Sequence, residues 1–203
     1  KGKQIHDKIL HKGFLVNDVV VGTALVDMYA KCGVLSKAYQ VLEELPFRNV
    51  VSWNALIAGY TQQGQGNEAL NCFELMKSEV SPDAVTFISI LKACGKLKDI
   101  DKGEQIHEDI LSRGLLGKDI VLGCALVGMY TKCGVLAKAQ KLLEEYPIRN
   151  IVSWSALIAG FAEQGQGNEA LNCFERMQSE GLSPDAITFI CLLKACGNTG
   201  AIN

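Results

Sequence analysis

The stretch VVSWNALIAGYTQQGQGNEALNCFELM, residues Val50–Met76, returns almost unchanged as IVSWSALIAGFAEQGQGNEALNCFERM at Ile151–Met177. When the comparison is extended back to Asp18 and Asp119, the two copies are identical at 42 of 59 positions. A period of about a hundred residues is too long for one supersecondary unit, so smaller units must lie inside it. Units of three sizes recur, with 31, 34 to 35 and 36 residues. The sequence therefore predicts an array of repeats of unequal length.

The first half of this stretch has the spacing of an amphipathic helix. Over Ser52–Gln63 the apolar residues recur at positions i, i+3, i+4 and i+7, which places them on one helical face. A second such stripe follows, and no segment of the chain shows the sustained alternation of a strand. Because one helical hairpin cannot bury its stripe alone, the hairpins are predicted to stack as an all-α solenoid. The two stripes are Trp53, Leu56, Ile57 and Tyr60, then Ala69, Leu70, Phe73 and Met76.

Helix ends are also marked in this stretch. Ser52 is expected to cap the first helix and Asn67 the second, because both side chains can accept hydrogen bonds from free backbone N–H groups. The glycines around Gln65 are expected to end the first helix, and Ser81 with Pro82 to end the second.

The composition limits the classes of function. The 203 residues have 48% hydrophobic content and a formal net charge of −2. No segment reaches the ~18 uninterrupted apolar residues that a membrane span needs, so no membrane partner is expected. The near-neutral charge gives no global signature of nucleic-acid binding, which would therefore need a local surface. The chain begins at Lys1 without a signal-peptide pattern, and we interpret it as a piece of a longer protein.

The repeated words and their lengths resemble the P, S and L motifs of plant pentatricopeptide-repeat proteins of the PLS subclass. The stretch quoted above carries the P motif, TALVDMYAKCGVLSKAYQVLEELPFRN at Thr23–Asn49 the S motif, and DAVTFISILKACGKLKDIDKGEQIHEDILSRG at Asp83–Gly114 the L motif. Tetratricopeptide repeats have a similar hairpin, but their uniform length near ~34 residues and their signature are not present. The resemblance covers the whole chain and sets the units: a partial L repeat at 1–18 (second helix), S repeats at 19–49 and 120–150, P repeats at 50–83 and 151–185, an L repeat at 84–119 and a partial L repeat at 186–203 (first helix).

This resemblance implies a right-handed superhelical α-solenoid of helix-turn-helix repeats that binds single-stranded RNA, one base per repeat. In the family, the fifth and last residues of each motif read the base edge, and an apolar second residue sandwiches the base. The implied reading pairs are Thr23 with Asn49, Asn54 with Asp83, Cys124 with Asn150, and Ser155 with Asp185, with Ile88 and Asp119 as a weak L-repeat pair. The implied stacking residues are Val20, Val51, Val85, Val121, Val152 and Ile187.

The same resemblance implies a base register. The family reads adenine with Thr and Asn, uracil with Asn and Asp, and guanine with Ser and Asp. Cys with Asn departs from the usual pairs, so its base is left open, and the L repeat is expected to read little. The implied register is 5′-A-U-n-n-G-3′. Lys31 and Lys132, near the ends of the S-repeat first helices, are the candidates for phosphate contact.

Simpler roles for these residues stay open at this point. Asn54, Ser155 and Thr23 could be exposed polar residues at helix starts, the valines could belong to the core, and the two lysines could be solvated charges. A protein-interaction scaffold is the alternative function, with accessory RNA-editing proteins bound through the L repeats. The apolar stripes of the terminal half repeats also predict self-association.

The cysteines and histidines are predicted to have structural roles. Six of the eight cysteines form three pairs of equivalent positions in the two copies, and no C-x-x-C or zinc-finger spacing occurs. All eight are interpreted as reduced packing residues, and no metal site is expected. His6 and His107 recur in the word QIH and are predicted to pack between helices with a satisfied hydrogen bond.

Catalytic residues are not expected in this chain. Proteins of the PLS subclass often end in a zinc-dependent deaminase domain that converts C to U in organellar RNA, which needs a zinc-ligand set with C-x-x-C and a glutamate. The nearest string, HED at His107, places Glu108 directly after the histidine, and no C-x-x-C follows. The chain is therefore predicted to need no cofactor and to be the RNA-recognition part of an organellar RNA-processing or editing factor. The resemblance implies the mitochondrion or the chloroplast as its location.

Overall fold

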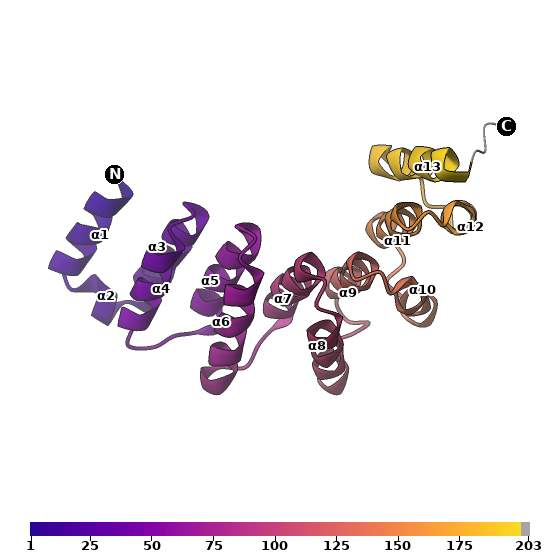
Figure 1. Cartoon of the computed structure of the whole chain (residues 1–203). Coiled ribbons are helices and arrows are strands. Elements are labelled where there is room, and N and C mark those ends of the chain that lie inside the picture. Colours follow the sequence, from indigo (N-terminus) through magenta and orange to yellow (C-terminus); the bar gives the residue numbers. More distant parts are fainter. Residues whose placement is uncertain (200–203) are drawn as a thin grey trace. The chain divides into compact units, whose positions relative to one another are not determined.

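A computed structural model describes residues 1–199, and every regular element in that part of the chain is a helix (Figure 1). The predicted half repeat at 186–203 runs past it, so its residues 200–203 lie outside the described residues. A short helix at 14–17, which the repeat pattern did not predict, precedes the first S repeat. The helices are α1 (Gly2–His11), α2 (Phe14–Asn17), α3 (Val19–Lys31), α4 (Leu35–Glu44), α5 (Val50–Gln62), α6 (Gly66–Glu79), α7 (Ala84–Leu97), α8 (Ile100–Ser112), α9 (Ile120–Lys132), α10 (Leu136–Glu145), α11 (Ile151–Glu163), α12 (Gly167–Ser179) and α13 (Ala186–Thr199).

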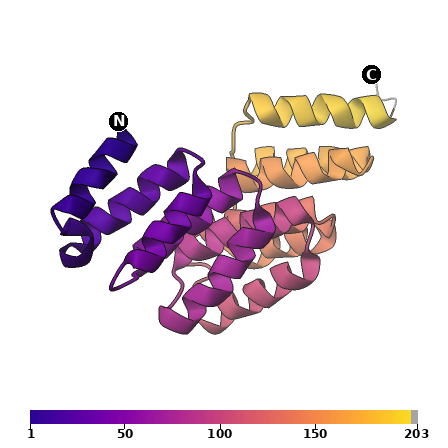
Figure 2. The same cartoon turned by 60° about the vertical axis from the view of Figure 1, so that its left-hand side comes forward.

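The chain divides into two compact units, Lys1–Ala93 and Cys94 onward, with the division inside α7. In the first unit α3 packs on α4 and on α5, and α5 packs on α6. In the second unit α9 packs on α10 and on α11, while α11 packs on α12 and on α13 (Figure 2). Each unit is thus a stack of helical hairpins whose first helices lie side by side. The predicted α-solenoid fold is confirmed.

The apolar stripe predicted for α5 forms the core of its repeat. Trp53, Leu56 and Ile57 are all buried, and so are their equivalents on α11, Trp154, Leu157 and Ile158. A glycine on the same helix sets the spacing to the preceding repeat, because a Cβ atom at Gly59 would lie 2.8 Å from the Ala30 Cβ atom of α3. The first helices α3 and α5 are therefore packed closely against each other.

The helix caps differ from the predicted ones. Asn49, not Ser52, caps α5: its Oδ1 accepts from the Ser52 backbone N–H at 2.8 Å, and Ser52 Oγ accepts from the Asn49 backbone N–H at 3.1 Å. Ser52 is the inner member of this capping box, as Ser153 is in the second copy. The predicted cap at Asn67 is also wrong. The backbone of Gln65 already accepts the first-turn hydrogen bond of α6, so the helix begins at Gly66 and no side chain caps it.

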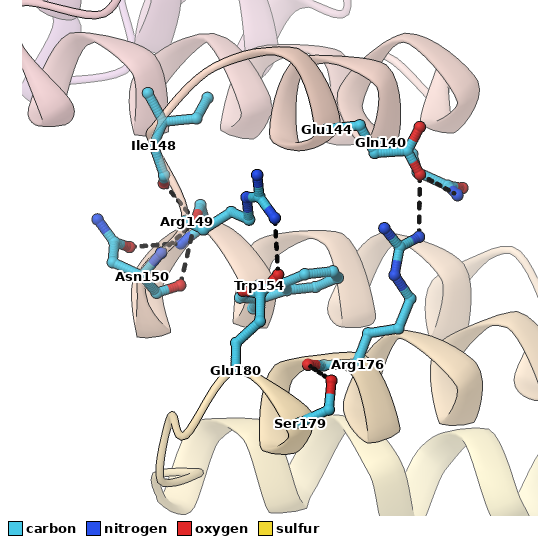
Figure 3. A network of polar contacts seen from close by, with 10 residues as sticks. Gln140, Glu144, Ile148, Arg149, Asn150, Trp154, Arg176, Ser179 and Glu180 are labelled. Atoms are coloured by element: carbon cyan, nitrogen blue, oxygen red, sulfur yellow. Dashed lines mark hydrogen bonds and ion pairs between the residues drawn. The ribbon is translucent and has the colours of Figure 1, made fainter.

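A repeated cluster of hydrogen bonds and ion pairs connects the start of each P repeat with its end. The indole N–H of buried Trp154 donates to Glu180 at 2.9 Å, and Arg149 pairs with the same carboxylate at 3.0 Å (Figure 3). Arg176 lies 5.5 Å above the Trp154 ring and pairs with Glu144. The first copy repeats the core of this cluster, with Trp53 donating to Glu79 and Arg48 pairing with it. The tryptophan is thus both a core residue and a hydrogen-bond donor.

The recurring histidines contact tyrosines of a neighbouring helix as predicted, but in the described part of the chain only one ring nitrogen of each is hydrogen-bonded. His6 Nδ1 and the Tyr29 hydroxyl are 2.9 Å apart, and His107 Nδ1 and the Tyr130 hydroxyl are 2.8 Å apart. Within the described residues the Nε2 atom of each histidine is buried and has no hydrogen-bond partner. Burial lowers the pKa of His107, mainly by desolvation, and so favours its neutral form.

Four of the eight cysteines are buried as the packing interpretation predicts, three are half-buried, and one is exposed. Cys72, Cys94, Cys173 and Cys191 are buried, and burial raises the pKa of Cys72 and Cys94 to about 12. Cys32 is exposed because it lies at the C-terminal end of α3, where the chain turns at Gly33. Among the described helices, none has the length and apolar character needed to cross a membrane.

Candidate nucleic-acid interface

One apolar side chain stands exposed near the start of every first helix. These residues are the second positions of the units, and their exposed fractions run from 55% at Val85 to 77% at Val20. Their exposure excludes a place in the core. Within the first unit, Val20 and Val51 project from neighbouring helices into the same hollow. The six residues are Val20, Val51, Val85, Val121, Val152 and Ile187.

The hollow between α3 and α5 contains the first predicted reading pair. It encloses about 360 Å³ and is lined by Val20 and Val51 at its sides, with Thr23 and Asn49 among the polar lining residues. The Thr23 hydroxyl is buried, yet it has no hydrogen-bond partner among the described residues. Asn49 uses its Oδ1 atom as the cap of α5, which leaves the two amide hydrogens for other partners. The remaining lining residues are Ala24, Asp27 and Ala55.

The second predicted pair is brought into direct contact. Asn54 is only 8% exposed, and its Nδ2 donates to Asp83 Oδ1 at 3.0 Å. Thr86, from the start of α7, joins both: its hydroxyl donates to Asn54 Oδ1 at 2.6 Å, and its backbone N–H donates to Asp83 Oδ1 at 2.9 Å. Asn54 is therefore not an exposed polar residue at a helix start. It belongs to a polar cluster between one repeat and the next.

Asp83 is ionised at neutral pH. Partial burial tends to raise its pKa, but hydrogen bonds from the Thr86 backbone, the Asn54 amide and the Thr86 hydroxyl together hold the pKa below its usual value. The pKa of Asp185 is lowered as well, chiefly by hydrogen bonds from the backbone and hydroxyl of Thr188. Both carboxylates can therefore only accept hydrogen bonds.

Ser155 and Asp185 are joined through a third residue. Ser155 is 7% exposed, and its hydroxyl lies 2.7 Å from that of Thr188. The Thr188 hydroxyl and backbone N–H both contact Asp185 Oδ1 at 2.8 Å. The fifth and last residues of the second P repeat thus form one cluster with Thr188, without a direct bond between them.

Cys124 and Asn150 contact each other directly. Asn150 Nδ2 lies 3.2 Å from Cys124 Sγ, within the range of a weak hydrogen bond to sulfur. The Asn150 Oδ1 atom accepts from the Ser153 backbone N–H at 2.9 Å, so it also caps α11. Cys124 is half-buried, as Thr23 is in the first copy.

The residues of the weak L-repeat pair have separate surroundings. Ile88 is half-buried on α7. Asp119 caps α9 and accepts from the backbone N–H groups of Val121 and Leu122 at 2.8 and 3.1 Å. Its carboxylate is therefore already hydrogen-bonded to the first turn of α9.

The two phosphate candidates differ in their partners. Both are exposed, but Lys31 pairs with Asp27, one helical turn before it, at 2.6 Å. In the second copy Gly128 replaces this aspartate, and Lys132 makes no ion pair within the described part of the chain. Lys132 is therefore the less neutralised of the two charges.

Two residues at the candidate sites were missed in the sequence. Thr86 and Thr188 each contact both reading residues of the preceding P repeat. Their signal was present in the words SPDAVTF and SPDAITF, where an aspartate followed three residues later by threonine has the spacing of a helix cap with its inner partner.

Family profiles match most of the chain. The profile described as PPR repeat family matches residues 48–96 and 149–198, and the profile described as PPR repeat matches residues 23–50 and 85–115. A pentatricopeptide repeat-containing protein of Arabidopsis thaliana is 40% identical over 204 residues, which cover 100% of this chain and 28% of that protein. The chloroplastic pentatricopeptide repeat-containing protein CRR2 of the same plant is 41% identical over 207 residues, which cover 100% of this chain and 31% of CRR2.

Solved structures show the same fold. The crystal structure of the pentatricopeptide repeat protein PPR10 from maize matches 88% of this chain and 27% of PPR10 with a TM-score of 0.69 and 24% identity. PPR10 in complex with an 18-nucleotide psaJ RNA element matches 95% of this chain and 30% of PPR10 with a TM-score of 0.74 and 21% identity. The chain thus spans less than a third of the length of these relatives.

Proposed function

Because the chain belongs to the pentatricopeptide-repeat family, we propose that it binds single-stranded RNA in the register 5′-A-U-n-n-G-3′. We assign it to the RNA-recognition part of a PLS-subclass factor for RNA processing or C-to-U editing in the mitochondrion or chloroplast. The RNA held by PPR10 and the chloroplastic relative CRR2 support this assignment. In this proposal the fifth and last residues of each S and P repeat read a base, and the exposed second residues stack against it.

The observation that carries the proposal is the hollow between α3 and α5. Two exposed valines flank it, and it contains a buried Thr23 hydroxyl without a partner among the described residues, together with an Asn49 amide that has hydrogens to donate. An unpaired buried polar group costs on the order of 1–3 kcal/mol, so a ligand that satisfies it gains that energy. A base stacked between Val20 and Val51 would bring its edge to both groups.

Adenine fits these groups by its hydrogen-bonding edge. Its N1 atom accepts and its exocyclic amino group donates, so the edge needs one donor and one acceptor side by side. The Asn49 amide nitrogen donates, and the Thr23 hydroxyl oxygen accepts. The Asp27 carboxylate lines the same hollow and adds acceptor character there. This supports adenine as the first base of the register.

The Asn54 and Asp83 cluster favours a base whose ring nitrogen carries a hydrogen. The amide nitrogen of Asn54 uses one of its two hydrogens for Asp83, which leaves one for a base carbonyl. The ionised Asp83 has about four lone-pair sites, not all of them used, and can only accept hydrogen bonds, so at the ring nitrogen it needs an N–H. Uracil and guanine carry that N–H, whereas adenine and cytosine have a lone pair there. Asp185 imposes the same choice in the second P repeat.

Side-chain size then separates uracil from guanine. Asn54 and Ser155 occupy equivalent positions, and serine is the smaller residue. The smaller side chain leaves more room for a purine, which supports guanine at Ser155 and uracil at Asn54.

A binding series tests the register. RNAs of the form A-U-n-n-G are compared with versions in which the U and the G are exchanged, at one fixed salt concentration and at micromolar protein. We expect the matched RNA to bind more tightly by about five- to thirtyfold for each mispaired base, since a mispaired polar group costs roughly 1–2 kcal/mol. Equal binding of all the RNAs would contradict the proposed register.

A protein-interaction scaffold remains the second proposed function. The net charge of −2 does not favour a polyanion, and α13, which begins the partial L repeat, exposes Phe189, Ile190 and Leu193. Such an apolar face suits an accessory editing protein. Absence of RNA binding under every condition of the series above would favour this function over base reading.

A further inference from the structure

Two threonines connect each P repeat to the repeat that follows it. Thr86 and Thr188 are the third residues of α7 and α13, and both are fully buried. Each hydroxyl contacts the fifth residue of the preceding P repeat, at 2.6 Å for Thr86 with Asn54 and 2.7 Å for Thr188 with Ser155. In both copies the threonine contacts the fifth and the last residue of the preceding P repeat, but only Asn54 also contacts its aspartate directly.

We propose that these threonines are positioning residues, so that base selection by a P repeat depends on the third residue of the next repeat. The inference rests on the proposed function and deepens it. A P-repeat site then consists of three side chains from two repeats, namely the fifth and last residues and the following threonine.

Thr86 and Asp83 together fix the orientation of the Asn54 amide. A threonine hydroxyl has one hydrogen, and its oxygen accepts from the Asp83 backbone N–H at 3.1 Å. The hydrogen has two acceptors within reach, Asn54 Oδ1 at 2.6 Å and Asp83 Oδ1 at 2.9 Å, and the shorter contact assigns it to Asn54. Asn54 Nδ2 then faces the ionised Asp83. The reversed amide would place two acceptors, Asn54 Oδ1 and the carboxylate, against each other.

This fixed orientation decides what a base meets. With the amide held by Thr86 and Asp83, Asn54 presents an N–H rather than an oxygen. Without the Thr86 hydroxyl, the Oδ1 atom loses its donor, and only the contact between Nδ2 and Asp83 still holds the amide. The expected loss is therefore in the choice between bases.

In the described part of the chain, the S repeats have no such contact between their fifth residue and a hydroxyl of the next repeat. Ser52 and Ser153 stand at the same third position, but their hydroxyls bond to backbone oxygens. Ser52 donates to Asn49 at 2.9 Å, and Ser153 lies 2.8 Å from the Ile148 oxygen and 3.1 Å from that of Asn150. The Thr23 hydroxyl finds no partner among the described residues. The reading residues of the P repeats are thus already hydrogen-bonded in the absence of RNA. In the first S repeat, the hydroxyl of the fifth residue has no partner among the described residues.

The two equivalent threonines give a test with an internal control. Thr86→Val and Thr188→Val keep the shape of the side chain and remove the hydroxyl. For each variant, binding is measured to the matched RNA, to one with C for U at the second base, and to one with A for G at the fifth base. Thr86→Val is expected to lower the second-base preference about fivefold and keep the fifth-base preference, since one hydrogen bond has about this net effect. Thr188→Val is expected to do the reverse, and Thr86→Ser to restore the wild-type preference.

Distinct outcomes separate the inference from the function it rests on. Unchanged preference at the second base in Thr86→Val overturns the inference and leaves the register standing. Equal loss at both bases in either variant also overturns it, because that result marks a general effect on folding. Failure of the unaltered chain to distinguish the RNAs overturns the proposed function itself.

Discussion

Asn49 shows how one side chain can serve both the fold and a proposed recognition site. Its Oδ1 atom caps α5, and the residue also lines the hollow that contains Thr23. The same double use appears at Asn150, which caps α11 and contacts Cys124. A polar residue that a helix start already requires can therefore take on a base-reading role without adding an unpaired buried group.

The two lysines provide a prediction about salt dependence. Each phosphate contact on single-stranded nucleic acid contributes a slope of about −0.7 to log K against log salt. Lys132→Ala is expected to lower the magnitude of the slope by about this amount, whereas Lys31→Ala should change it less, because Asp27 already neutralises Lys31. Titrations at several salt concentrations measure both slopes. A larger effect at Lys31 would contradict the assignment, and Asp27→Gly, which reproduces the second copy, should make Lys31 behave like Lys132.

Asp83 provides a prediction about pH. Its folded-state pKa is lowered, so its contribution to stability is present above the ordinary aspartate pKa and is lost as the pH falls through the lowered value. The free energy of unfolding of the wild type should exceed that of Asp83→Asn at pH 7, and the difference should vanish in strong acid. Urea unfolding at a series of pH values measures this difference. A difference that stays constant into strong acid would show that the carboxylate charge has no part in it.

At the scale of the helices, spacing between repeats depends on glycines that allow close approach. Gly59→Ala would bring a Cβ atom to 2.8 Å from Ala30 Cβ and 2.9 Å from Leu35 Cδ2. We expect this change to lower the free energy of unfolding by roughly 1–3 kcal/mol through overpacking. Gly128→Ala is the matched control, because a Cβ there meets nothing within 4 Å and should stabilise α9 by about 0.5–1 kcal/mol. Urea denaturation of both variants checks the contrast, and equal effects would contradict it.

The helices themselves were predictable, because the spacing of Trp53, Leu56 and Ile57 leaves only one face to bury. The residues that cap the helix starts were harder to predict. Serine and asparagine both suit a cap, and spacing alone did not show that Asn49 takes the outer position and Ser52 the inner one. Thr86 was missed for a related reason: its spacing from Asp83 is that of a cap, but its contact with Asn54 in the preceding repeat has no local pattern. Cys32 was misplaced because composition suggests burial without locating a helix end.

At the scale of the whole molecule, the chain exposes apolar side chains on its outermost helices. Ile5 on α1 is 57% exposed, and Leu193 on α13 is 73% exposed. We expect the 22.0 kDa chain to self-associate, so that its apparent mass rises with concentration in sedimentation experiments. Leu193→Lys should reduce the effect. A mass that stays monomeric at every concentration would contradict this expectation.

The duplication also offers the most direct test of base reading. The two P repeats share their frame and differ at the fifth residue, Asn54 in one and Ser155 in the other, each with an aspartate and a threonine as neighbours. Asn54→Ser would therefore recreate the second site within the first. The measurement is the ratio of dissociation constants for A-U-n-n-G and A-G-n-n-G, in the wild type and in the variant. Base reading by these residues predicts that the wild type prefers U and the variant prefers G, each by about fivefold or more. The same order of preference in both proteins would contradict it.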